Sequence, residues 1–137
     1  MMSHLVLLDN EAVAALRPEH AKHRKVVSHI QVVAHRKRRG LQVHVAVPNC
    51  VRVEGGWDRS AAGWAFANQL RIADVVLDAE QANQAAEIRT RTKVSVADAH
   101  VGAAIRSAAA DRVTVLTSDP GDMRRVAGDS AVTVVAL

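Results

Sequence analysis

The sequence predicts a single α/β domain in which helices cover both faces of a mostly parallel sheet, giving three α/β/α layers. The chain has 137 residues, which fits one compact domain with one core. Short continuous apolar runs recur along it, as is typical of strands buried on both faces. Helical patterns alternate with these runs, as in strand–helix–strand units. We therefore expect residues 1–137 to form one domain with one functional site.

The predicted elements follow from apolar runs and from helical spacing. The strands are expected at Leu5–Leu8, Val43–Val47, Ile72–Leu77, Val113–Leu116 and Val132–Ala136. The helices are expected at Asn10–Leu16, at Glu19–Arg39, from Pro48 to Glu54, at Ser60–Leu70, from Asp78 to Thr92, after Ser95 and after Pro120.

Residues with clear terminal preferences set the helix boundaries. Pro18 breaks the first helix, and Gly40 closes the second in the manner of a C-terminal cap. Asp78, followed by Gln81, and Ser95, followed by Asp98, form N-terminal capping patterns. These signals support a chain that alternates between strands and helices.

Charge and cysteine content narrow the classes of function. The net charge of +4 would favour a polyanionic partner without establishing one. Cys50 is the only cysteine and the seven histidines form no zinc-binding pattern, so neither a disulfide framework nor a zinc site is expected. The longest apolar runs fall far short of the roughly 20 residues of a membrane helix, and no signal peptide precedes them, so we expect a soluble cytoplasmic protein.

Four acidic residues stand where a parallel sheet would bring ligands together. Asp9 and Asp119 follow predicted strands, Asp98 lies in the first turn of a helix, and Glu54 lies near the end of a short helix. Loops after the carboxyl ends of parallel strands meet at one edge of the sheet. Each acid by itself is explained as a helix cap or a solvated side chain. Together they would repel one another unless a hard divalent cation lay between them, and such a cation can assist hydrolysis of a phosphodiester.

The sequence also resembles a known family. The motifs that carry the resemblance are Leu5–Asn10, Val47-Pro48 followed by Glu54, Val96–His100 with Gly102–Ala104, and Val115–Asp119 with Asp122. In this order they resemble the motifs of PIN-domain nucleases, most closely those of bacterial VapC-type toxins. The resemblance runs from Leu5 to about Val135. It implies an α/β/α fold, dependence on Mg²⁺ or Mn²⁺, endonucleolytic cleavage of RNA, frequent homodimers and inhibition by a cognate antitoxin.

The resemblance also assigns roles to individual residues. Asp9, Glu54, Asp98 and Asp119 match the four acidic residues of the family's metal site, and Asp122 matches a further acidic position. Thr117 or Ser118 matches the hydroxyl residue that supports the site. Asn10, also in a supporting position, departs from the small hydroxyl residue common there, and Gly55-Gly56 follow Glu54 where a helix usually continues.

Other features have both a functional and a structural interpretation. Arg36, Arg38 and Arg39 are candidate RNA contacts, although cations at the end of a helix also complement its dipole. His100 is expected at the surface rather than as a general base, because its place on the helix turns it away from Asp98. Trp57 and Trp64 are expected to be core or interface anchors.

Two alternatives to an endoribonuclease remain open. A catalytically silent PIN-like module could bind RNA or a protein partner, which Asn10 and the glycine pair make plausible. A different phosphoesterase on a similar sheet could act on DNA or on a small phosphate ester. Metal-dependent cleavage and a panel of substrates would separate the three.

Overall fold

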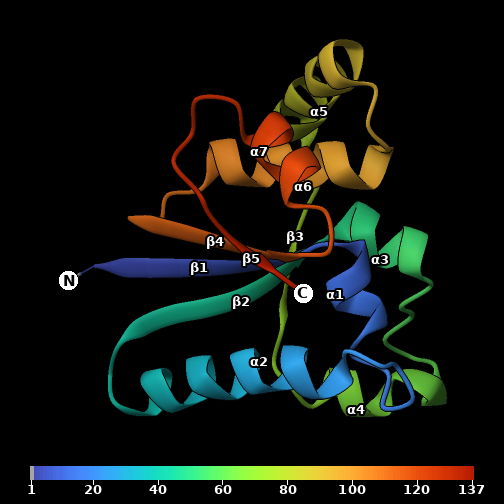
Figure 1. Cartoon of the computed structure of the whole chain (residues 1–137), viewed down its shortest axis with the longest axis vertical. Helices are drawn as coiled ribbons and strands as arrows, with labels where there is room; N and C mark the ends of the chain where they lie inside the picture. The colour runs from blue at the N-terminus through green and yellow to red at the C-terminus, as the bar shows by residue number, and fades with distance from the viewer. Residues whose placement is uncertain (1) are drawn as a thin grey trace.

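The computed structural model describes residues 2–137 and contains one sheet of parallel strands in the order β3-β2-β1-β4-β5 (Figure 1). The strands are β1 (Ser3–Leu8), β2 (Gln42–Pro48), β3 (Ala73–Val75), β4 (Arg112–Thr117) and β5 (Thr133–Ala136). Each predicted strand is present, and all four strand pairings among the described residues are parallel.

Helices cover both faces of this sheet. They are α1 (Asn10–Ala14), α2 (His23–Arg38), α3 (Asn49–Gly55), the 3₁₀ turn η1 (Ala62–Trp64), α4 (Ala65–Asn68), α5 (Ala79–Thr92), α6 (Val96–Ser107) and α7 (Pro120–Ala127). Helices α2 and α4 lie on one side, α5, α6 and α7 lie on the other, and α1 and α3 stand at the carboxyl ends of the strands (Figure 1). The three-layer α/β/α fold is thus confirmed.

Three elements differ most from their predicted bounds. Helix α2 begins at His23 rather than Glu19, because residues 18–22 turn, closed by a hydrogen bond from the His23 N–H to the His20 carbonyl. Strand β3 is shorter than expected because it is an edge strand that faces only Ala46–Pro48 of β2. The segment Ser60–Leu70, expected as one helix, divides into η1 and the single turn α4.

The core is built from aliphatic strand residues and from a helix of small residues. Leu7, Leu8 and Leu116 are almost completely buried in β1 and β4. Helix α6 is buried from Ala99 to Ile105. A Cβ on Gly102 would lie 2.8 Å from the Val126 carbonyl oxygen, so the bare glycine is what lets α6 and α7 approach so closely.

The strand register decides which residues meet at the carboxyl edge of the sheet. Leu8 at the end of β1 pairs with Leu116 in β4. The Asp9 N–H continues the ladder by donating to the Leu116 carbonyl over 3.2 Å. Asp9 and the residues that follow β4 therefore lie side by side.

None of the helices within residues 2–137 has the length and hydropathy of a membrane span.

Candidate functional site

Asp9 is a buried carboxylate at the junction of β1 and α1. Its side chain is 4% exposed and accepts the Ala12 N–H over 3.0 Å, so Asp9 is the N-terminal cap of α1. Burial raises the pKa of Asp9, and hydrogen bonding from Thr117 and from the backbone opposes that rise. Asp9 is therefore a helix cap, which the sequence analysis gave as the alternative to a role in the site. The capping hydrogen bond involves only part of its carboxylate.

Thr117 supports this edge of the sheet from β4. Its side chain is completely buried, and its hydroxyl accepts the Asp119 N–H over 2.8 Å. The same side chain favours the ionised form of Asp9, as does the backbone of Ser118. Ser118 itself is exposed. Of the two predicted hydroxyl residues, Thr117 is thus the one whose side chain joins two of the predicted acids.

Asp98 lies in the first turn of α6 with its carboxylate half-buried. Its N–H donates to the Ser95 Oγ over 3.1 Å, so Ser95 caps the helix as predicted. The pKa of Asp98 is raised to about 6, first by burial and then by the negative charges of four other acids: Asp9, Asp122, Glu54 and Asp119. The charges of the four other predicted acids therefore all act on Asp98.

Asp119 and Asp122 form the start of α7. Asp119 is the N-terminal cap and accepts the Asp122 N–H over 3.1 Å. Asp122 forms an ion pair with Arg125 over 2.9 Å, and Arg125 also donates to the Thr92 carbonyl over 2.6 Å. One of the predicted acids thus already has a cation partner, whereas Asp119 is exposed.

Glu54 stands in the last turn of α3, exposed to solvent. Asn10 donates to its carboxylate over 3.4 Å, which joins α3 to α1. A Cβ on Gly55 would lie 3.2 Å from a Val13 methyl group, so glycine favours this close approach, and Gly56 ends α3 with a φ of 71°. The glycine pair does stop the helix, but only after Glu54 has been placed beside Asn10.

The acidic side chains converge without forming a finished coordination shell. Within residues 2–137, no three His, Cys, Asp or Glu side chains lie together closely enough to hold a metal ion as they stand. The donor set nevertheless fits a hard divalent cation, since it consists of carboxylate oxygens, and the pKa of Asp98 is raised first by burial and then by the charges of the other acids. Small rotations of exposed side chains such as Glu54 and Asp119 would be needed to complete a site.

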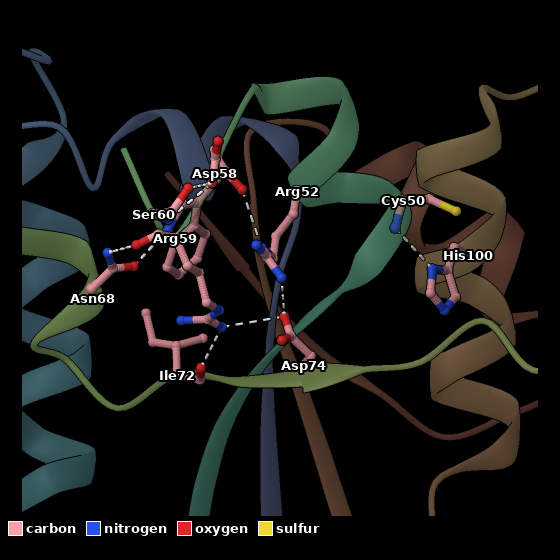
Figure 2. A network of polar contacts seen from close by, with 10 residues as sticks. Cys50, Arg52, Asp58, Arg59, Ser60, Asn68, Ile72, Asp74 and His100 are labelled. Carbon is pink, nitrogen blue, oxygen red and sulfur yellow. Dashed lines mark hydrogen bonds and ion pairs between the residues drawn. The ribbon is translucent and has the colours of Figure 1, made fainter. Parts of the chain in front are cut away.

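His100 is buried, so the expectation of a surface position was wrong. The ring is fully enclosed, and its Nδ1 accepts the Cys50 N–H over 3.2 Å (Figure 2). Its Nε2 lies 3.1 Å from the Gln81 Oε1. Burial lowers the pKa of His100, as suits a neutral ring with one accepting and one donating nitrogen. His100 thus connects α6, which carries Asp98, to α3, which carries Glu54.

A second network holds the far side of α3. Arg52 and Arg59 both donate to Asp74, over 3.0 and 3.2 Å, and Arg59 also reaches the Ile72 carbonyl over 2.7 Å (Figure 2). Trp57 and Trp64, buried as predicted, stack with ring centroids 5.6 Å apart. The sequence analysis missed these arginines, because partners many residues apart leave no local signal. They tie α3 to β3.

The predicted RNA contacts lie away from the carboxylates. The positive charges of Arg112 and Arg36 add to burial in lowering the pKa of His4, which places Arg36 near the amino end of β1. Arg38 and Arg39 follow at the end of α2, whereas the acids lie at the carboxyl ends of the strands (Figure 1). The structure therefore separates the basic run from the acidic cluster by the length of the sheet.

Comparison with known proteins bears on the fold. No protein-family model matches the sequence, and no curated protein matches it. Among solved structures, a chain in the crystal structure of VapBC2 from Rickettsia felis bound to a DNA fragment from their promoter is 13% identical, with a TM-score of 0.62. The match covers 97% of this chain and 98% of that chain. It confirms the expected PIN-like α/β fold over nearly the whole length, and at this identity it concerns the fold alone.

Proposed function

We propose that the protein is a divalent-metal-dependent endoribonuclease. The observation that carries the proposal is Asp98, whose carboxyl group is half-buried among four other carboxylates and has a pKa raised to about 6. Such crowding is costly unless a cation neutralises it. In this proposal Asp9, Glu54, Asp98 and Asp119 hold Mg²⁺ or Mn²⁺, with Asp122 as an accessory ligand.

The chain's own residues would prepare the site for phosphodiester hydrolysis. Asp9 is held by the Ala12 N–H and favoured as an anion by Thr117, so its orientation is set before any ligand arrives. Asn10 holds Glu54 at the mouth of the cluster. When bound, a divalent cation supplies the acidity to activate a water and the charge to stabilise the phosphorane-like transition state.

The partners belong to the same proposal. The fold likeness to a chain of the VapBC2 complex supports a toxin role, in which a cognate antitoxin protein would bind and inhibit this chain. RNA is the proposed substrate, a homodimer the proposed assembly and the cytoplasm the proposed compartment.

A silent binding module is the second candidate. It is favoured by the separation of the acidic side chains, which do not yet form a coordination shell within residues 2–137. It is also favoured by Asn10, whose buried Oδ1 has no hydrogen-bond partner among the described residues. On this alternative the carboxylates would serve only as helix caps.

Cleavage assays separate the two candidates. The purified protein is incubated with single-stranded and with structured RNA, with and without Mg²⁺ or Mn²⁺, beside Asp9→Asn and Asp98→Asn. Asp129→Asn is the matched control, because Asp129 is an exposed acid outside the cluster. We expect metal-dependent cleavage by the wild type and the control, with a loss of at least about 100-fold in both site variants. Cleavage that survives EDTA or both substitutions would refute the carboxylate mechanism.

DNA and a small phosphate ester are included as further substrates. Hydrolysis of these in place of RNA would assign the site to another class of phosphoesterase.

A further inference from the structure

A cavity of about 430 Å³ lies between α2 and the segment that leads into β3, away from the acidic cluster. Its floor is apolar, with Ile30 and Val33 from α2 and Leu70 from the segment before β3. Its volume is in the range of pockets that receive a ligand group. The cavity is therefore large enough to accept one or two apolar side chains.

The rim of this cavity is basic. Lys37 and Arg38 from α2 and Arg71 from the segment before β3 line it, and all three are exposed. No ion pair is recorded for these three within residues 2–137. Between Glu19 and Glu54 the sequence contains no acidic residue at all. The basic rim is therefore suited to pair with acidic groups, which the described part of the chain does not supply.

An unpaired strand edge borders the same cavity. Strand β2 pairs with β1 from Gln42 to Ala46, but its other edge pairs with β3 only from Ala46 to Pro48. Among the described strands, none covers that edge from Gln42 to Val45. Val45 lines the cavity, so the open edge and the cavity adjoin. Open backbone donors and acceptors of this kind are templates for an added strand.

We propose that this surface binds an acidic, extended segment of a partner protein by strand addition. The segment pairs with the open edge of β2, and its side chains that face α2 include apolar ones that enter the cavity and carboxylates that meet Lys37, Arg38 and Arg71. Every second residue of a strand lies on the same face, so residues spaced by two can supply both kinds of contact. The inference concerns a surface distinct from the carboxylate cluster and does not depend on nuclease activity.

Two other occupants fit the surface less well. Surfaces that bind single-stranded RNA combine a basic groove with aromatic side chains on which bases stack, and no aromatic residue is among those of the described chain that line the cavity. RNA also cannot pair with a row of backbone groups in strand register. A second copy of this chain would bring like charges together unless it presented an acidic edge here.

Binding is tested with a fluorescein-labelled peptide that carries Leu or Glu at every second position and Ser between them, measured by fluorescence anisotropy against the full chain. A peptide of the same composition with its Leu and Glu residues adjacent in sequence, so that they cannot share one face of a strand, is the control. We expect the Lys37→Glu, Arg71→Glu double variant to bind at least about tenfold more weakly. The matched control is Arg24→Glu with Lys25→Glu, which makes the same change of charge on exposed residues of α2 outside the cavity.

Strand addition is tested separately from charge. The peptide is N-methylated on alternate residues in each of two registers, and we expect one register to abolish binding and the other to keep it. Hydrogen exchange at Gln42–Val45 should slow when the peptide binds. Asp98→Asn should leave peptide binding unchanged, which separates this surface from the carboxylate site.

The proposal is overturned by any of three results. These are equal losses in the two double variants, indifference to both N-methylated registers, and unchanged exchange at Gln42–Val45. If single-stranded RNA displaces the peptide and depends on Lys37 and Arg71, the surface is an RNA site instead.

Discussion

Among single residues, Asp98 has the surroundings least favourable to its ionised form. Burial is the largest cause of its raised pKa, and the charges of Asp9, Asp122, Glu54 and Asp119 add to it. The helix-capping pattern at Ser95 predicted where this residue would start a helix, and the convergence of strand ends predicted its acidic neighbours. The burial that is the largest cause of its raised pKa depends on residues far apart in the sequence, so only the folded chain shows it.

The pKa of Asp98 predicts how the metal-free protein responds to pH. Its folded pKa of about 6 exceeds the ordinary value of 3.8. The folded state therefore binds this proton more tightly, so the contribution of Asp98 to stability falls as pH rises from about 4 to about 6 and remains lower above that. In EDTA, Asp98→Asn should remove this fall and raise the free energy of unfolding at pH 8 by about 1–2 kcal/mol, after allowance for solvent screening. Denaturant unfolding at pH 4, 6 and 8 measures it.

Asp129→Asn is the control for the pH experiment, and it should keep the wild-type dependence. The lowered pKa values of His4 and His100 make stability rise with pH below about 6.5, so the test is the difference in stability between the wild type and Asp98→Asn. A difference that does not grow between pH 4 and 6 would contradict the raised pKa of Asp98.

Replacing His100 by a side chain of similar shape should lower the free energy of unfolding strongly. His100→Phe would leave the Cys50 N–H and the Gln81 Oε1 without their partner in a partly buried place. We expect the free energy of unfolding to fall by about 2–4 kcal/mol. Gln81→Ala removes only one of the two contacts and should cost about 1 kcal/mol. If chemical denaturation finds the two variants equally stable, His100 does not join α3 to α6 as described.

At the scale of elements, helix α6 shows how small residues decide packing. The sequence predicted its apolar stripe, and the structure buries nearly the whole helix between the sheet, α5 and α7. One stripe was expected because a helix at the surface needs only one. Burial on several sides arises from neighbours that the helix's own sequence does not encode.

Gly102 gives the test of this packing. An added Cβ would lie 2.8 Å from the Val126 carbonyl oxygen and 2.9 Å from the Ile88 Cδ1, and the first of these is backbone that cannot move alone. Gly102→Ala should therefore lower the free energy of unfolding by about 2–4 kcal/mol, which thermal or chemical denaturation measures. Gly63→Ala is the control, because its nearest neighbour is an arginine side chain at 3.8 Å. An equal effect at both glycines would show that α6 and α7 can separate freely.

In the whole molecule, the basic run and the cluster of carboxylates lie at opposite ends of the sheet. Residues 22–39 contain seven Lys and Arg residues and no acid, whereas the rest of the chain has eleven against fourteen acids. The net positive charge thus belongs to α2 and its ends. The basic run at the end of α2 lies at the amino ends of the strands, and the carboxylates lie at the carboxyl ends (Figure 1).

This division predicts how RNA length changes the role of the basic run. An RNA that reaches both ends must span the six residues of β1, roughly 20 Å. Replacing Arg36, Arg38 and Arg39 by Ala should reduce the slope of log affinity against log salt by about 2 for long single-stranded RNA. A short RNA confined to the carboxylates should show no change. An unchanged slope with long RNA would remove these arginines from the RNA-binding surface.

The sequence by itself determined the strands, the order of the elements, the helix caps and the acidic residues, because these follow from local apolar runs and side-chain preferences. Asp78 and Ser95 cap their helices as predicted, since a cap involves atoms only three residues apart. Only the tertiary structure decided the sheet order, the burial of His100, the pairing of Asp74 with two arginines and the partial burial of Asp98. The physical reason is that burial and electrostatic coupling depend on distances between chain segments, and those distances are set by the packing of the whole sheet and its helices.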